Sequence, residues 1–322
     1  MQGSFLDFER PLVELAEKIS EMEELSTRGE IGLNEELDAL KKRLLKLRQE
    51  VSSKLTRWQR VQLARHPKRP LTDDYIKNIM SDFIELHGDR LFRDDPSIVA
   101  GFAKFEDRKI VVIGHQKGHD THENIKRNFG MAHPEGYRKA MRIMELGAKF
   151  GLPIVIFIDT PGAYPGIGAE ERGQAESIAR NLMKMSLLPT PIVIIIIGEG
   201  ASGGALGIGL GDSILMMENS WYSVISPEGC AAILWRDRAK APQAAEALKV
   251  TAQDLLEIGM IDRIIKEPPG GAHWQPEEAF LAVKRELSKE LNYLDGIDIE
   301  ELLQRRLKKY REMGAYTENG DS

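Results

Sequence analysis

The N-terminal part of the chain has the apolar spacing of amphipathic helices. Apolar residues recur there in steps of three and four, in two separate series. The first series is Leu12, Leu15, Ile19, Met22 and Leu25, and the second is Leu33, Leu37, Leu40, Leu44, Leu47 and Val51. Such steps place apolar side chains on one helix face and are typical of a coiled-coil seam. Because Arg28-Gly29-Glu30-Ile31-Gly32 interrupts the pattern, we predict a helical hairpin that packs on the main body or on a partner chain.

The pattern changes after the prolines of His66-Pro67-Lys68-Arg69-Pro70, where a helix cannot continue. From about Ile98, short apolar runs rich in β-branched residues alternate with helical segments. The runs predict strands at residues 109–114, 153–159, 191–197, 214–217 and 261–265, with helices at 135–150 and 170–185 between them. Strands that are apolar on both faces are typical of a sheet covered by helices on both sides, so the fold class is α/β.

The chain therefore divides into three expected parts. Charged amphipathic sequence from Pro276 to Met313 predicts helices after the α/β region. We expect an N-terminal helical hairpin extension at residues 1–70, a core at residues 71–275 and a C-terminal helical extension at residues 276–322.

Composition limits the class of protein. The chain has 322 residues, 42% hydrophobic and 29% charged, with no apolar run of the roughly 18 residues that a membrane-spanning helix needs. Its first residues carry no pattern of a secretory signal. Cys230 is the single cysteine, which excludes an internal disulfide and fits a reducing cytoplasm. A net charge of -6 argues against nucleic acid as the main partner. We therefore expect a cytoplasmic protein that binds neither membrane nor nucleic acid.

The most informative segment is the glycine-rich stretch from Gly198 to Gly209, which follows the strongest predicted strand. Gly198, Gly200 and Gly203 match G-x-G-x-x-G, a dinucleotide-binding pattern. The same stretch contains G-x-S-x-G around Ser202, a nucleophile elbow whose triad would require His273, the only later histidine.

A third interpretation of this stretch uses only the main chain. Glycines at a helix N-terminus leave N–H groups unpaired and open to approach, and these can stabilise an oxyanion. Here the amides would be those of Gly203 and Gly204. Close helix packing without any ligand is the fourth interpretation, and the spacing alone does not choose among them.

A second loop helps to separate these interpretations. The segment from Asp159 to Gly173 also follows a predicted buried strand, is rich in glycine and proline, and leads into a helix. Two such loops on successive strands would form opposite walls of one cleft. A main-chain site for a carbonyl group accounts for both loops, whereas a dinucleotide fold accounts for only one.

Several long blocks of this sequence closely resemble the carboxyltransferase alpha subunit family of bacterial-type acetyl-CoA carboxylase. The central blocks are Thr160-Pro161-Gly162-Ala163-Tyr164-Pro165-Gly166 and Gly200-Ala201-Ser202-Gly203-Gly204-Ala205. Further blocks begin at Trp58, Gly114, Arg127, Pro134 and Ser226, so the resemblance runs from the N-terminal helices to about Ile265. It implies a crotonase-like (ClpP/crotonase) core with helical extensions.

The resemblance also implies partners and cofactors. Family members transfer a carboxyl group from carboxybiotin to acetyl-CoA, giving malonyl-CoA for fatty acid biosynthesis. They act as α2β2 assemblies with a carboxyltransferase beta subunit, which contributes much of the acetyl-CoA site and carries the zinc ribbon. The biotin is covalently bound to biotin carboxyl carrier protein and is carboxylated by biotin carboxylase. No metal is expected in this chain.

The chemistry that the resemblance implies leads to a hypothesis for the roles of particular residues. The main-chain amides of Gly203 and Gly204 would form the oxyanion hole facing biotin. Gly162 and Ala163 would shape the opposite wall, and Tyr164 would pack on the biotin ring.

A basic stretch lies near the predicted cleft and contains Lys117, Lys126, Arg127, Arg138 and Lys139. It is interpreted either as a site for the anionic groups of coenzyme A or carboxybiotin, or as a solvated helix face. Lys117 and Arg127 are the candidates for substrate binding.

Three histidines fall close together at His115, His119 and His122. Their spacing allows a metal-site hypothesis but lacks an evident supporting shell, so we do not expect a metal there. The resembling family has basic residues at the last two positions. If those residues meet an anion, binding in this chain would be weaker and dependent on pH.

Overall fold

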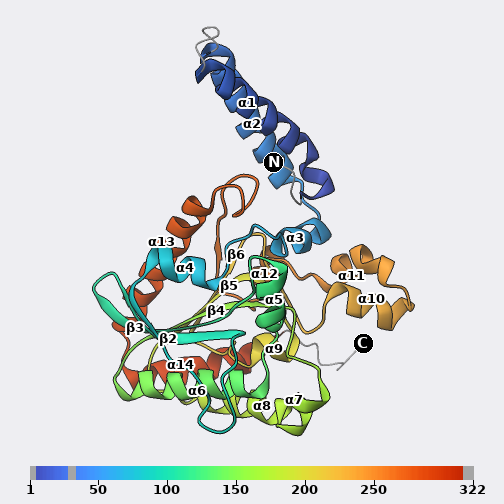
Figure 1. Ribbon diagram of the computed structural model, residues 1–322. Helices are drawn as coiled ribbons and strands as arrows, with labels where there is room; N and C mark the ends of the chain where they lie inside the picture. Colours follow the sequence, from blue (N-terminus) through green and yellow to red (C-terminus); the bar gives the residue numbers. More distant parts are fainter. Residues whose placement is uncertain (1–4, 28–33, 315–322) are drawn as a thin grey trace, which may run out of the picture.

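The computed structural model describes residues 5–27 and 34–314 of the chain (Figure 1). The predicted hairpin turn at residues 28–32 and the seam residue Leu33 lie outside the described residues.

A mixed sheet forms the centre of the molecule, in the strand order β1-β2-β3-β4-β5-β6-β8, with β7 paired to β5. The strands are β1 (Ser81–Glu85), β2 (Ile98–Phe105), β3 (Arg108–His115), β4 (Ile154–Thr160), β5 (Ile192–Ala201), β6 (Ser213–Met217), β7 (Trp221–Ser223) and β8 (Arg263–Ile265). The pairs β1–β2 and β2–β3 are antiparallel, and the others are parallel. All five predicted strands are present, so the α/β prediction is confirmed.

Each central strand contributes to two cores because alternate side chains point to opposite faces. In β5, Val193, Ile195 and Ile197 belong to one core, while Ile194 and Ile196 belong to the other. Helices α4 (Thr72–Ile79) and α13 (Pro276–Asp295) pack on the first face. Helices α6 (Pro134–Lys149) and α8 (Gln174–Met185) pack on the second (Figure 1). This double coverage explains why the strands lack polar alternation.

The remaining helices are shorter or lie outside the two layers. They are α1 (Arg10–Thr27), α2 (Asn34–Ser53), α3 (Arg57–Ala64), α5 (Thr121–Lys126), α7 (Ile167–Glu171), α9 (Ser202–Leu206), α10 (Pro227–Trp235), α11 (Ala241–Leu248), α12 (Ala252–Glu257) and α14 (Ile299–Glu312). Short 3-10 turns occupy Asp7–Glu9, Asn128–Gly130 and Arg238–Lys240. The predicted helix at residues 170–185 is divided, because Gly173 has a left-handed φ of 81° between α7 and α8. The described part of the C-terminal extension also contains two helices, because α13 ends at Asp295 and Gly296 is its C-cap.

Helices α1 and α2 form a hairpin that projects from the body (Figure 1). Its buried seam consists mainly of predicted positions, with Leu12, Ile19, Leu37 and Leu44 at its centre. At its base, the Ser52 hydroxyl accepts a hydrogen bond from the amide of Gly270 at 2.8 Å, and Arg48 lies 4.4 Å from the Trp274 ring. The base of the hairpin thus packs on its own chain. Among the described helices, none combines the length and apolar character needed to cross a membrane.

Candidate active site

The two predicted walls meet at the carboxyl ends of β4 and β5. These strands are parallel neighbours, so the loops that follow them begin at the same edge of the sheet. A Cβ atom added to Gly204 would lie 2.3 Å from the carbonyl carbon of Gly162 and 2.5 Å from the nitrogen of Ala163. Real Cβ atoms do not approach a backbone so closely. The glycine turn after β5 therefore contacts the backbone of the loop after β4 directly.

The turn into α9 contains two main-chain N–H groups that do not bond within the helix. Ser202 has a φ of 57°, in the left-handed region, which costs of order 1 kcal/mol for a residue other than glycine. Ala201, the N-cap of α9, supplies no capping side chain. Within residues 5–27 and 34–314, no acceptor is found for the amides of Gly203 and Gly204, which belong to the first turn of α9. The two amides are thus unpaired donors in the described part of the chain, at a half-buried Gly203 and a buried Gly204.

The nucleophile-elbow interpretation is wrong for this turn. Its Ser202 is exposed. His273 is occupied elsewhere: its Nε2 lies 2.7 Å from Glu9 Oε1, and its ring stacks on His66 at 3.9 Å. A catalytic triad needs its histidine within hydrogen-bond reach of the serine. The strained serine is therefore a feature of the backbone turn.

The dinucleotide interpretation fails on topology and on packing. Strands β3, β4, β5, β6 and β8 add in chain order, so β5 is not the point at which strand order reverses, where dinucleotides bind. Gly198 and Gly200 lie inside β5, and their missing side chains leave room for others. A Cβ on Gly198 would lie 2.4 Å from Asp159 Oδ1, and one on Gly200 would lie 2.6 Å from Tyr222 Cδ2. Packing thus accounts for these two glycines.

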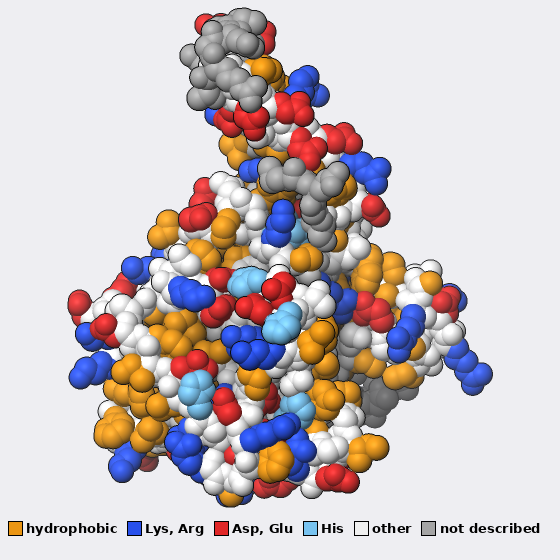
Figure 2. Space-filling model, viewed as in Figure 1, with side chains coloured by type: hydrophobic (Ala, Val, Ile, Leu, Met, Phe, Trp, Pro, Cys, Tyr) orange, Lys and Arg blue, Asp and Glu red, His pale blue; other side chains and the backbone are white. Residues whose placement is uncertain are grey.

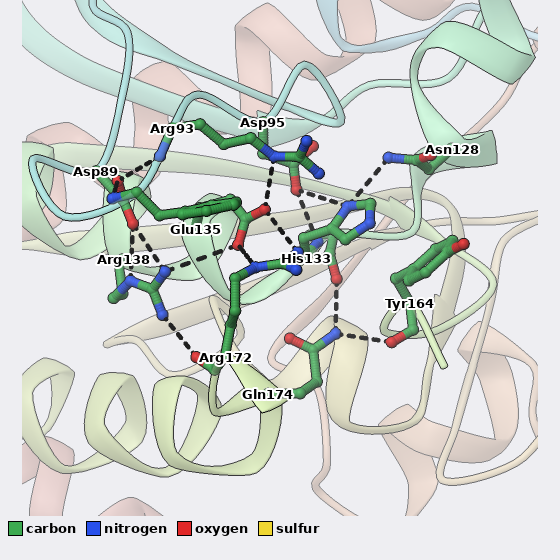
Figure 3. Close-up of polar contacts among 12 residues, drawn as sticks. Asp89, Arg93, Asp95, Asn128, His133, Glu135, Arg138, Tyr164, Arg172 and Gln174 are labelled. Carbon is green, nitrogen blue, oxygen red and sulfur yellow. Dashed lines mark hydrogen bonds and ion pairs between the residues drawn. The ribbon is translucent and has the colours of Figure 1, made fainter. Parts of the chain in front are cut away.

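The opposite wall is fixed by short polar contacts. The Thr160 hydroxyl accepts a hydrogen bond from the Gly162 amide at 3.1 Å and donates one to the Gly162 carbonyl at 2.8 Å. The Tyr164 amide donates to the Ala132 carbonyl at 3.0 Å. The Tyr164 ring stacks on His133 with ring centres 4.1 Å apart (Figure 3). The predicted wall residues therefore lie together, on a backbone with little freedom.

Lys117 lies between the two loops but is already paired. Its Nζ donates to Asp159 at 2.7 Å and to Glu199 at 2.8 Å, and Arg65 Nε donates to Glu199 at 2.6 Å. Burial alone would lower the pKa of Lys117, but the two carboxylates raise it above its ordinary value. Burial alone would raise the pKa of Glu199, but Lys117 and Arg65 hold it below its ordinary value. These groups remain ionised and border a cavity of about 310 Å³ that reaches Pro161 and Phe129.

Most of the predicted basic stretch is likewise paired within the chain. Arg127 donates to the Pro96 carbonyl at 2.9 Å. Lys139 donates to Asp94 at 2.7 Å, and Arg138 donates to Asp89 at 2.8 Å. These contacts match the alternative in which individual positions of the stretch serve structure. Figure 2 shows acidic, basic and histidine side chains intermixed over the centre of one face.

Glu135 is a buried carboxylate at the start of α6 that the sequence analysis did not single out. Arg93 donates to it at 3.0 Å, and Arg172 donates at 3.0 and 3.1 Å (Figure 3). Burial opposes ionisation, yet Arg172 and the other donors hold the pKa of Glu135 below its ordinary value. The spacing of these three residues along the chain carries no signal of their contact.

The three clustered histidines do not come together. His115 is fully buried at the end of β3, and burial lowers its pKa to about 3. The nearby Gly204 backbone would by itself raise the pKa, but it offsets only part of the effect of burial. Neither ring nitrogen has a hydrogen-bond partner of normal geometry. His119 is on the surface, with Nε2 3.3 Å from Asp74. Asp73, beside it, is bound by Lys77 and Gln116, so this acidic group is engaged with its own neighbours.

A second hollow opens beside the glycine turn. It has a volume of about 420 Å³, and Ser202 and Tyr222 form part of its lining. Its other walls are largely apolar and include Leu206, Val224 and Ile258. Hollows of this size and character accommodate small ring systems.

Two solved structures share this core. Transcarboxylase 12S aligns with a TM-score of 0.56 and 19% identity, over 69% of this chain and 41% of that chain. The beta subunit of P. aeruginosa geranyl-CoA carboxylase aligns with a TM-score of 0.55 and 16% identity, over 77% of this chain and 46% of that one. This chain spans less than half the length of either. The likeness establishes the fold alone, and the predicted crotonase-like α/β core is confirmed.

Sequence comparison is more specific. Residues 5–314 match the family described as acetyl co-enzyme A carboxylase carboxyltransferase-like. The chain is 54% identical over 313 residues to acetyl-coenzyme A carboxylase carboxyl transferase subunit alpha of Thermus thermophilus, covering 97% of this chain and 99% of that protein. It is 54% identical over 317 residues to the protein of that name from Halalkalibacterium halodurans, covering 98% of each. The chain therefore belongs to the carboxyltransferase alpha subunit family of acetyl-CoA carboxylase, and the resemblance seen in the sequence is confirmed.

Proposed function

We propose that this chain is the alpha half of a biotin-dependent carboxyltransferase that moves the carboxyl group of carboxybiotin to acetyl-CoA and gives malonyl-CoA. Family membership supports this activity. The observation that carries the catalytic assignment is the pair of amides of Gly203 and Gly204, which have no acceptor in the described part of the chain and lie where two loops meet.

The proposed chemistry needs main-chain donors more than a reactive side chain. The bond between the carboxyl carbon and the ureido nitrogen breaks, and its electron pair remains on the ureido group. Gly203 and Gly204 donate hydrogen bonds to the ureido oxygen as negative charge reaches it, an effect of about 3–4 kcal/mol per donor in measured cases. The ureido nitrogen takes a proton from the acetyl methyl group, and the methyl carbon bonds to the released carbon dioxide. One carboxyl group and one proton have then exchanged places.

The walls of the cleft hold the ring in place. We assign Gly162 and Ala163 to the wall opposite the glycine turn and Tyr164 to packing on the biotin ring. Lys117 and Arg127 are the proposed contacts for anionic groups of the substrates. Because both are bound within the chain, an incoming anion competes with Asp159, Glu199 and the Pro96 carbonyl for them.

The rest of the reaction depends on partners. We propose an α2β2 assembly in which the beta subunit supplies most of the acetyl-CoA site. Biotin arrives on biotin carboxyl carrier protein after biotin carboxylase has loaded it, and the product enters fatty acid biosynthesis. The single cysteine, Cys230, is buried in α10 and supports a cytoplasmic location.

The activity is tested by mixing this chain with its beta partner and measuring malonyl-CoA-dependent carboxylation of free biotin. We expect transfer by the mixture and none by either subunit alone. Ser202→Ala is the matched control for a serine mechanism and should keep most of the activity. Transfer by this chain alone, or an inactive complex of confirmed composition, would contradict the proposal.

The oxyanion assignment is tested by an amide-to-ester exchange at Gly204, introduced by in vitro translation with glycolic acid. The exchange removes the N–H group and adds no side chain. We expect kcat to fall about 10²–10³-fold, as for loss of one oxyanion donor. The same exchange at Glu277, in the first turn of α13, is the control and should leave kcat unchanged. Equal kcat for the two esters would refute the assignment.

A further inference from the structure

Helix α8 carries two buried amide side chains that each bridge two carbonyl groups. Gln174 Nε2 donates to the Ala132 carbonyl at 2.8 Å and to the Tyr164 carbonyl at 3.0 Å. Asn181 Nδ2 donates to the Tyr137 carbonyl at 2.9 Å and to the Gly207 carbonyl at 2.8 Å. The two amides are 5% and 2% exposed. Seven residues are about two helical turns, so both amides lie on one face of α8.

Each amide joins a different wall of the cleft to the same end of α6. Gln174 joins the Tyr164 wall to Ala132, which lies just before the first residue of α6. Figure 3 shows the Gln174 amide between the two loops, below the stacked rings of Tyr164 and His133. Because the Tyr164 amide also donates to the Ala132 carbonyl, the two loops are linked by a pair of hydrogen bonds. The main chain of Tyr164 is therefore held against Ala132, while its ring stacks on His133.

Asn181 contacts the glycine turn through the Gly207 carbonyl, to which it donates a hydrogen bond. The amide of the same Gly207 donates to the Gly203 carbonyl at 2.9 Å. The Tyr137 ring occupies the space that a Gly207 side chain would need, with its Cε1 2.4 Å from the position of the missing Cβ. The C-terminal end of α9 is therefore held against α6 and α8, and Asn181 is linked to Gly203 through Gly207.

We propose that Gln174 and Asn181 are positioning residues for the carboxyl transfer: Gln174 sets the wall that binds the biotin ring, and Asn181 sets the main-chain donors that stabilise the developing charge. This inference rests on the proposed function. The two roles predict different kinetic effects. A misplaced binding wall weakens ground state and transition state alike and raises KM, whereas misplaced donors weaken only the transition state and lower kcat.

The test uses Gln174→Met and Asn181→Leu. Each replaces the amide side chain by an apolar one of similar size and so removes the bridging donor. Each variant chain is assayed in its complex with the beta partner, with free biotin and malonyl-CoA. For Gln174→Met we expect the KM for biotin to rise about tenfold or more, with kcat within about twofold. For Asn181→Leu we expect kcat to fall about tenfold or more, with the KM for biotin within about twofold.

Thr190→Val is the matched control. Thr190 is also buried and donates from its hydroxyl to the Leu152 carbonyl at 2.8 Å, but it lies just before the amino end of β5, away from the cleft. Both kinetic constants should stay at the unmodified values. If either apolar variant fails to fold, Gln174→Glu and Asn181→Asp remove the donor and retain the shape. We then expect the same effects, on the KM for biotin for Gln174→Glu and on kcat for Asn181→Asp.

The outcomes distinguish this inference from the proposed function. An unmodified complex without transfer contradicts the proposed function. An active complex in which the Gln174 and Asn181 variants change the same constant, or behave like Thr190→Val, overturns only the positioning role of α8.

Discussion

Gly204 has no room for a side chain, because its Cβ would lie 2.3 Å from the carbonyl carbon of Gly162. The two loops that form the candidate cleft therefore touch through bare backbone. Neither loop sets the width of the cleft alone, and a single methyl group at this contact must move one of them. The glycine pattern of the turn follows from packing as well as from the need for open amides.

The adjacent glycine gives a matched comparison. Gly204→Ala should destabilise the chain by about 1–3 kcal/mol and lower transferase activity, since overpacking displaces the Gly162 loop. A Cβ on Gly203 would meet only Ile178 Cδ1, at 3.4 Å, which is ordinary contact. Gly203→Ala should therefore change the free energy of unfolding by less than about 1 kcal/mol. Urea unfolding of both variants checks this, and equal destabilisation would show that the 2.3 Å contact is relieved without cost.

Lys117→Met tests the buried ion cluster between the loops. The substitution leaves Asp159 without its lysine partner, while Glu199 retains only Arg65. We expect a loss of about 3–5 kcal/mol in the free energy of unfolding at pH 8, as for removal of one partner of a buried pair. Without Lys117, the pKa of Glu199 rises, so the loss should be smaller at pH 5.

The matched control for this prediction removes the excess charge. Adding Asp159→Asn to Lys117→Met should recover part of the stability at pH 8, because the carboxylate that lost its lysine partner is gone. Urea unfolding at the two pH values measures both effects. A loss that does not depend on pH would mean that Lys117 contributes through packing alone.

The fold was predictable where the hydrophobic pattern was long. The strand at residues 191–197 and the seam of the N-terminal hairpin have periodicities that admit few alternatives, and both are present. The division of the predicted helix at residues 170–185 was not foreseen. It depends on the left-handed Gly173, and a single glycine within a helical pattern is a weak sign of a break.

The candidate site was predictable in its backbone and less so in its charges. Glycine and proline mark turns locally, so both loops were found from sequence. Contacts such as Arg172 with Glu135, or Gln174 with Ala132, join residues far apart in the chain and leave no local pattern. The paired state of Lys117 was missed for the same reason: Asp159 and Glu199 become its neighbours only when β3, β4 and β5 align.

His115 should make stability depend on pH below neutrality. Its pKa of about 3 in the folded chain lies below the ordinary value of 6.5, so between these values the unfolded chain binds the extra proton. Stability therefore falls as pH decreases through this window. The expected loss from His115 between pH 7 and pH 5 is about 2 kcal/mol.

The difference between the native chain and His115→Leu isolates this contribution, because other titrating groups are common to both. Urea unfolding at pH 5, 6 and 7 should give a shallower dependence for the variant. Identical dependence in the two chains would indicate that His115 is protonated without penalty in the folded state.

Glu9 should hold the helical hairpin on the body. Its Oε1 lies 2.7 Å from His273 Nε2 and accepts from Trp274 Nε1 at 3.0 Å, and the carboxylate is almost fully buried. Burial opposes ionisation, but His273 and the other donors hold the pKa of Glu9 below its ordinary value. The stabilisation is therefore present above about pH 4.5 and is lost as pH falls further. Glu9→Ala leaves the Trp274 donor unpaired and should cost about 1–3 kcal/mol of attachment.

Hydrogen exchange of the chain at pH 7 measures this attachment directly. In Glu9→Ala, amides of α1 and α2 should exchange about 5- to 150-fold faster, because each 1.4 kcal/mol corresponds to a factor of ten, while amides of β5 keep their protection. Glu36→Gln, an exposed position on α2, is the control and should leave both sets unchanged. Unaltered exchange in α1 and α2 of the Glu9 variant would place the attachment in the Ser52 and Arg48 contacts instead.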